Sequence, residues 1–156
     1  MNLKRVVLLA AMFSMLYTAI EAEIPYRRYC NARFAYCLDY PARFTMEAAP
    51  VNNDGRTFYD EYGGMEMEVY GTHNALESTL SADMRETAGE IDRVTYKKMG
   101  RNWFVLSGYS GRNIVYIKKW LHNDEFYVLQ MIYPVSAKKI YDKIVTRISR
   151  SFGIAR

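Results

Sequence analysis

The fold is decided by residues 91–134, IDRVTYKKMGRNWFVLSGYSGRNIVYIKKWLHNDEFYVLQMIYP. Four runs rich in β-branched and aromatic residues, the composition of strands, alternate with short turn sequences at 100–102, 110–112 and 122–124. Strands joined by such short connections run antiparallel, because a parallel neighbour needs a long crossover. The stretch therefore predicts an antiparallel meander.

A β-hairpin is predicted upstream of the meander, where TFYDEY and MEMEVYGT flank Gly63 and Gly64. The two glycines can supply the positive φ angles that a tight two-residue turn requires. In the second arm, Met65, Met67 and Val69 alternate with polar residues. This alternation predicts a strand in a sheet with one buried face.

The segment between the hairpin and the meander predicts an amphipathic helix. Apolar residues recur at every fourth position, and they are Leu76, Leu80, Met84 and Ala88. Asn74 is predicted to cap the start of this helix, and Glu77 stands three residues later, as in a capping box. Gly89 is predicted to end it.

The C-terminal segment predicts a closing helix. The last strand of the meander stops at Pro134, and Ser136 is predicted to be the N-cap of the helix. The apolar stripe of this helix consists of Ile140, Ile144, Ile148 and Phe152. Near the other end of the domain, RFAYCLDYP at 33–41 is predicted to be a strand that stops at Pro41.

Residues 1–22 have the layout of a secretory signal peptide. Lys4 and Arg5 form a basic start, an apolar run covers 6–20, and Ala22 is the small residue before the cut. The run is shorter than the roughly 20 apolar residues that a spanning helix needs. We therefore predict a periplasmic or secreted protein without stable membrane insertion after cleavage.

Residues 23–156 are predicted to form a single α+β domain, with an antiparallel sheet of about five to seven strands, an inserted helix and a C-terminal helix packed on the sheet.

The order and spacing of its elements resemble the PsbP-like α/β/α sandwich family. The sequences that carry the resemblance are DYP, NDG, NWFVLSG, IVYIKKW and YP, with a last helix that ends in SF. That family includes photosystem extrinsic proteins, Ran-binding relatives and exported bacterial proteins. The resemblance implies a compact binding or accessory domain without general catalytic residues.

The two cysteines of the chain, Cys30 and Cys37, are predicted to form a disulfide across a small hairpin, CNARFAYC. A closely spaced pair in an exported protein is typical of a disulfide. The alternative is a catalytic thiol at Cys37 with His73 as its base.

The motifs of common enzymes and metal sites are missing or incomplete. PVNNDGRTFYDE at 50–61 resembles a calcium loop, but Pro50 stands where an EF-hand needs aspartate. A turn is therefore predicted there, with a cation held by Asp54, Asp60 and Glu61 as the alternative. GYSG at 108–111 resembles the start of a nucleophile elbow, GxSxG, but Arg112 stands where the pattern needs its second glycine. No HExxH, CxxC or phosphate-binding glycine loop occurs in the sequence. The sequence predicts no enzyme, no metal and no cofactor.

Charge is divided unevenly along the predicted domain. Positions 23–96 hold 7 basic and 13 acidic residues, a net charge of −6, whereas positions 97–156 hold 12 basic and 3 acidic residues, a net charge of +9. Alternate turns of a meander lie on the same edge of the sheet, so the turns at 100–102 and 122–124 are predicted to be neighbours. Their flanks would form a basic rim of Lys97, Lys98, Arg101, Lys118, Lys119 and Trp120.

The leading functional prediction is an exported, non-enzymatic accessory or binding protein that acts by protein–protein contact in the cell envelope. An inhibitor or immunity-type partner is one form of this role. The basic rim suits an acidic partner. The alternative, that the rim is only a solvated charged surface without a binding role, stays open. Nucleic acid is not expected as a partner of an exported protein. The alternatives are a small-ligand binder, with a pocket between sheet and helix lined by Trp103, Tyr116 and Tyr127, and the cysteine hydrolase.

Overall fold

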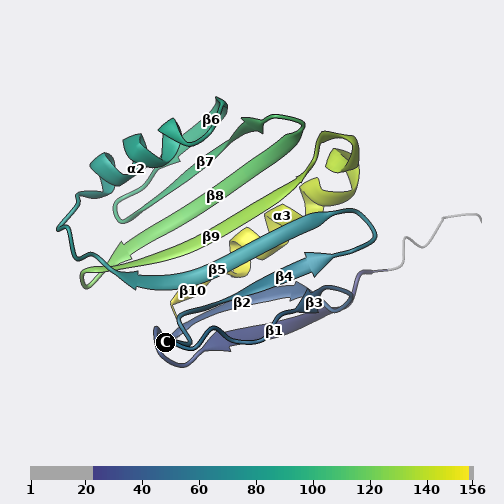
Figure 1. Ribbon diagram of the computed structural model, residues 1–156, viewed down its shortest axis with the longest axis horizontal. Helices are drawn as coiled ribbons and strands as arrows, with labels where there is room; N and C mark the ends of the chain where they lie inside the picture. Colours follow the sequence, from purple (N-terminus) through teal and green to yellow (C-terminus); the bar gives the residue numbers. More distant parts are fainter. Residues whose placement is uncertain (1–22, 155–156) are drawn as a thin grey trace, which may run out of the picture.

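The computed structural model describes residues 23–154, so the predicted signal peptide lies outside the described part of the chain. A seven-stranded sheet has the order β3-β4-β5-β9-β8-β7-β6, and a three-stranded sheet has the order β1-β2-β10 (Figure 1). The strands are β1 (Tyr26–Asn31), β2 (Tyr36–Pro41), β3 (Thr45–Met46), β4 (Gly55–Asp60), β5 (Met65–His73), β6 (Arg93–Met99), β7 (Trp103–Ser110), β8 (Asn113–His122), β9 (Glu125–Pro134) and β10 (Gly153–Ile154). The helical elements are α2 (Leu80–Gly89), the 3₁₀ turn η1 (Val135–Ala137) and α3 (Lys138–Ser151).

The predicted α+β class is confirmed. The meander β6-β7-β8-β9 is antiparallel throughout, and α2 lies between the hairpin and the meander, as predicted. The strand alternation in β5 is also confirmed, because Met65, Met67 and Val69 are buried and Glu66 and Glu68 are exposed.

The turn of the β4–β5 hairpin differs from the prediction. Asp60 pairs with Met65, so four residues connect the strands, and of the two glycines only Gly64 has a positive φ. The main-chain oxygen of Asp60 accepts hydrogen bonds from the amides of Gly63 and Gly64. These hydrogen bonds close a wider turn than the two-residue turn that the glycine pair suggested.

Helix α2 begins later than predicted, and the predicted capping box is wrong. The side chain of Asn74 accepts a hydrogen bond from the amide of Ser78 and closes a local turn, in which Glu77 has φ 50°. A residue in that left-handed conformation cannot belong to the first turn of an α-helix. Thr79 caps α2 instead, accepting a hydrogen bond from the amide of Ala82, and Leu76 is exposed.

Helix α3 follows η1 directly, and Ser136 makes no side-chain cap. Its predicted stripe is partly wrong, since Ile140 is exposed, whereas Ile144, Ile148 and Phe152 are buried as predicted. Tyr141 and Val145 complete the buried face.

The strand predicted at 33–41 is partly wrong, because its first residues form a turn and only Tyr36–Pro41 forms a strand. Asn31 at the end of β1 accepts hydrogen bonds through its side-chain oxygen from the amides of Arg33 and Phe34, and β2 begins only at Tyr36. Cys30 and Cys37 are register partners across this hairpin and form the predicted disulfide.

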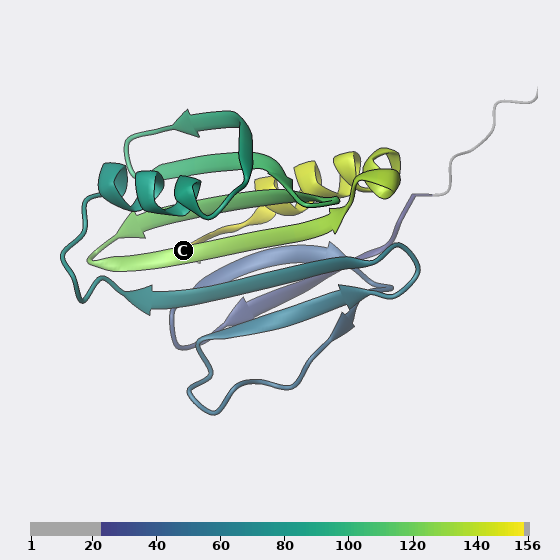
Figure 2. The ribbon, with the colours of Figure 1, turned by 45° about the horizontal axis from the view of Figure 1, so that its top comes forward.

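The helices cover opposite faces of the large sheet (Figure 2). Helix α3 and the small sheet pack on one face, over a core that includes Phe58, Leu129, Tyr141 and Ile148. Helix α2 packs on the other face against a smaller cluster around Phe104 and Leu106 of β7. On the sheet face that carries α3, the outer strands of the meander extend beyond the helix as far as β6. A groove lies between these strands and α3.

Candidate functional site

The candidate site is a groove of about 580 Å³ between the outer strands of the meander and α3. Its floor consists of alternate residues of three strands, because residues two apart in a strand share a face. The floor residues are Tyr96 and Lys98 of β6, Trp103 and Val105 of β7, and Tyr116, Lys118 and Trp120 of β8. The wall is α3, through Val145, Thr146, Ser149 and Arg150.

The aromatic part of the groove is built by strand register. Trp103 and Trp120 are directly opposed across β7 and β8, and their ring centroids lie 6.3 Å apart. Tyr116 is anchored to the helix wall, since its hydroxyl lies 2.6 Å from Oγ of Ser149. Large aromatic side chains held in this way offer apolar surface at little entropic cost.

Lys118 is the most constrained cation of the groove. Its Nζ donates a 2.6 Å hydrogen bond to the main-chain oxygen of Ser149, in the last turn of α3, and lies 5.1 Å from the ring centroid of Trp120. Burial lowers the pKa of Lys118 from its ordinary value of 10.5 to about 8. The negative end of the helix dipole favours a cation at this place.

The groove collects positive charge without a carboxylate. Its lining contains Lys98, Lys118 and Arg150 but neither aspartate nor glutamate. Nζ of Lys98 lies 6.0 Å from the ring centroid of Trp103. Three cations beside four aromatic rings suit an anionic group that is attached to an apolar or planar body.

The predicted basic rim is divided between the two faces of the sheet. The turns at 100–102 and 123–124 do share an edge, as the meander required. However, adjacent residues of a strand point to opposite faces, so Lys98, Lys118 and Trp120 line the groove. Lys97 pairs in register with Leu106 and therefore lies on the α2 face, and Arg101 is exposed in the turn.

Lys119 is engaged on the α2 face. Its Nζ lies 3.1 Å from Oδ1 of Asp83 in α2, and each of the two side chains is only 16% exposed. The structure therefore brings together half of the six predicted rim residues, and it adds Arg150 of α3, which the predicted rim did not include.

The predicted aromatic pocket between sheet and helix overlaps the same groove. Trp103 and Tyr116 line it, but Tyr127 is buried in the main core and its hydroxyl donates a 2.7 Å hydrogen bond to Glu125. Tyr96, which sequence reasoning did not select, takes a place on the floor. The sequence could have indicated Tyr96, because it stands two residues before Lys98 and therefore lies on the same face of the strand.

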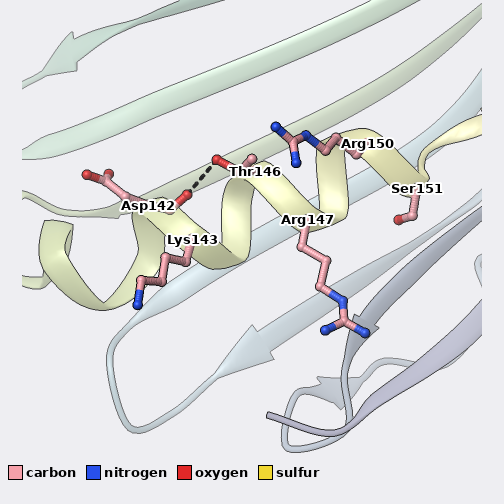
Figure 3. Close-up of a pocket in the computed structure, with 6 residues that line it drawn as sticks. All are labelled: Asp142, Lys143, Thr146, Arg147, Arg150 and Ser151. Carbon is pink, nitrogen blue, oxygen red and sulfur yellow. Dashed lines mark hydrogen bonds between the residues drawn. The ribbon is translucent and has the colours of Figure 1, made fainter. Parts of the chain in front are cut away.

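A second hollow, of about 730 Å³, lies on the outer side of α3 (Figure 3). Its lining residues all belong to that helix, and Arg147 and Arg150 point in different directions (Figure 3). The guanidinium of Arg147 lies 3.8 Å from the ring centroid of Tyr26 and pairs with Glu23 at 3.0 Å. The hollow therefore gathers no convergent set of groups.

The alternative sites that the sequence left open are not supported. Cys37 is bonded to Cys30, and residues 23–154 contain no free cysteine, so the cysteine-hydrolase alternative is wrong. Asp60 is fully buried and bound by Arg43 and Tyr141, which removes it from the alternative cation site. The described residues include no group of three potential metal ligands, and none of the described helices is long and apolar enough to span a membrane.

Comparison with known proteins gives similarity in fold alone. Neither a protein-family model nor a curated protein matches the sequence. The solution structure of cyanobacterial PsbP (CyanoP) from Synechocystis sp. PCC 6803 is similar, with a TM-score of 0.62 and 10% identity, over 90% of this chain and 99% of that one. The Saccharomyces cerevisiae Ran-binding protein Mog1p is similar with a TM-score of 0.56 and 10% identity, over 85% of this chain and 96% of that one.

A third similar structure comes from Bacteroides thetaiotaomicron VPI-5482, with a TM-score of 0.54 and 11% identity, over 83% of this chain and 48% of that one. The predicted resemblance is therefore confirmed at the level of the fold, and the chain has a PsbP-like fold. At such low identity no functional residue can be transferred from these structures, and the groove has to be interpreted from its own residues.

Proposed function

We propose that this chain is an exported, non-enzymatic accessory protein that binds an acidic partner protein in the cell envelope through the groove between β6–β8 and α3. The observation that carries the proposal is the lining, which combines three cations with four aromatic rings and contains no carboxylate. The fold supports a binding role, because one protein with this fold is described as Ran-binding.

The residue types of the groove are those that dominate protein interfaces. Tryptophan, tyrosine and arginine supply most of the binding energy at interface centres, where they fill desolvated pockets. Trp103, Trp120 and Tyr116 would supply such contacts, and Lys98 and Arg150 would steer an acidic surface toward them. The net charge of +9 on positions 97–156, which hold most of the groove, supports this steering.

Export is supported by two features of the chain. The first 22 residues have the composition of a signal peptide, and the Cys30–Cys37 disulfide suits an oxidising compartment. Both features support a periplasmic or secreted location.

Charge reversal within β6 offers a matched test. Lys98 lines the groove, whereas Lys97 is its neighbour on the opposite face, so the two variants change net charge equally. In capture from an envelope extract at low salt, Lys98→Glu should reduce recovery of the acidic partner by about tenfold, and Lys97→Glu by no more than about threefold. Equal recovery by the two variants, or the absence of any partner that wild-type protein retains, contradicts the proposal.

A small anionic ligand is the second candidate, because a groove of about 580 Å³ falls within the size range of ligand sites. Thermal unfolding measured in the presence of each compound of a metabolite and lipid panel distinguishes the small-ligand site from the protein-binding groove. A ligand present at 100 times its dissociation constant adds about 2.7 kcal/mol of stability, whereas a protein-binding groove should give no shift with any small compound.

A further inference from the structure

Strand β6 is a free edge of the large sheet. Within residues 23–154 it pairs with β7 alone, and six of its seven residues are exposed. The opposite edge, β3, has two residues. An edge strand presents unpaired backbone amide and carbonyl groups, which can accept another extended chain.

The groove lies alongside this edge and continues beyond the candidate site. A further hollow of about 430 Å³ contains Thr95 and Tyr109 and shares Tyr96, Tyr116, Val145 and Thr146 with the groove. Its one carboxylate, Asp142, is paired with Lys138. The two hollows together form a trench between α3 and the floor of β6, β7 and β8.

The β6 edge is long enough to pair with a short extended peptide. The seven residues of β6 extend for about 23 Å at about 3.3 Å per residue. A chain paired with β6 would direct every second side chain to the α3 side of the sheet, where Tyr96 and Lys98 mark the entrance of the trench. A short extended segment therefore has both backbone partners and side-chain space.

Charge decides what kind of segment the edge accepts. β6 and the turn after it carry Arg93, Lys97, Lys98 and Arg101, and residues 93–103 include no acidic residue. A second copy of β6 would bring like charges into opposition, which is unfavourable in a cross-strand pair. The irregularity between Val94 and Tyr96 further limits regular pairing to the part of the strand that borders the groove.

We propose that the partner of this protein contributes an extended acidic segment that pairs with β6 as an additional strand and places alternate side chains at the entrance of the trench. This inference rests on the proposed function and specifies how the acidic partner binds. Backbone hydrogen bonds would provide the pairing, and the acidic side chains on the α3 side would meet Lys98 at the entrance of the trench, whereas Lys97 faces the other side of the sheet.

The test uses the mature protein and a synthetic octapeptide that alternates glutamate with valine. Tryptophan fluorescence measures binding, and amide hydrogen exchange measured by nuclear magnetic resonance locates it. We expect binding of the glutamate peptide, slower exchange of β6 backbone amides in the complex, and affinity at least about tenfold weaker for Lys98→Glu. The same peptide with lysine in place of glutamate should not bind.

Two controls separate this inference from the proposed function. A glutamate peptide that binds in the groove without protecting any β6 amide overturns strand addition and leaves the groove as the binding site. Equal binding of the lysine peptide, or no binding of either peptide, overturns the acidic-segment inference. The capture experiment with Lys98→Glu and Lys97→Glu still decides the proposed function in each of these cases.

Discussion

Tyr141 in α3 donates a hydrogen bond of 2.8 Å through its hydroxyl to Oδ2 of Asp60 at the end of β4. The same oxygen accepts hydrogen bonds from Nε and Nη2 of Arg43, at 3.0 and 2.6 Å. The Asp60 carboxylate is fully buried, so hydrogen bonds from these two side chains offset part of the free-energy cost of burying it. This cluster joins the helix that walls the groove to the hairpin side of the sheet.

Removing the Tyr141 hydroxyl should destabilise the protein without changing its fold. Tyr141→Phe deletes a hydrogen bond to a charged, buried acceptor, and we expect the free energy of unfolding to fall by about 1.5–3 kcal/mol. Chemical denaturation measures this change. Tyr62→Phe is the matched control, because Tyr62 is 92% exposed and its hydroxyl should contribute little. Equal stability of Tyr141→Phe and wild type would show that the cluster does not stabilise the fold.

Gly63 is predicted to be required by the same cluster. A Cβ at this position would overlap the hydroxyl group and ring of Tyr141, so Gly63→Ala should displace the tyrosine from Asp60. Gly89→Ala is the control, since a Cβ there has no atom within 4 Å. The Gly63→Ala and Tyr141→Phe effects should be strongly non-additive, because both remove one interaction. Additive losses of stability in the double variant would contradict this link.

The disulfide should stabilise the protein modestly. Cys30 and Cys37 close a short loop, for which constraint of the unfolded chain predicts about 2–3 kcal/mol. The double variant Cys30→Ser/Cys37→Ser should therefore unfold at lower denaturant concentration than oxidised wild type. Reduced wild type is the control and should match the double variant. Identical midpoints for the oxidised and reduced proteins would contradict the prediction.

Lys118 should make stability depend on pH. Because burial lowers its pKa to about 8 in the folded state, the unfolded chain binds more protons than the folded one from about pH 8 toward 10.5. Stability contributed by this group is therefore constant below about pH 8 and rises above it. Tyrosines such as Tyr133, whose pKa is raised to about 12 by burial, act in the opposite direction above about pH 10.

Denaturation of wild type and Lys118→Met between pH 7 and pH 9.5 tests the sign. The stability of wild type relative to the variant should increase with pH in this window. Binding of an acidic partner should show the opposite trend, since deprotonated Lys118 no longer attracts an anion. A stability difference that falls with pH would contradict the depressed pKa.

The elements that the sequence predicts well are those set by neighbouring residues. The meander follows from apolar runs and turns that are each complete within a few residues, and the opposition of Trp103 and Trp120 follows from the short turns between their strands. Local competition explains the main error in α2, because the Asn74 turn uses the residues that resembled a capping box.

The candidate site was harder to predict because it depends on packing between distant segments. Lys118 and Lys119 are adjacent in sequence but lie on opposite faces, and the prediction of one rim neglected this alternation. Arg150 and Ser149 reach the groove only because α3 packs over β8 and β9, a relationship that no local pattern contains.

The divided rim leads to a last prediction, on Lys119. Its ion pair with Asp83 holds α2 against β8, and both partners are largely shielded from water. Lys119→Glu places a second carboxylate beside Asp83 and should cost about 2 kcal/mol, between the values of exposed and buried pairs. Lys98→Glu, a reversal on the exposed edge, should change stability by less than about 0.5 kcal/mol. Denaturation of the two single variants measures the contrast, and the exchanged pair Asp83→Lys/Lys119→Asp should recover part of the loss. If both reversals cost the same, Lys119 is as exposed as Lys98, and the assignment of the two lysines to different environments is wrong.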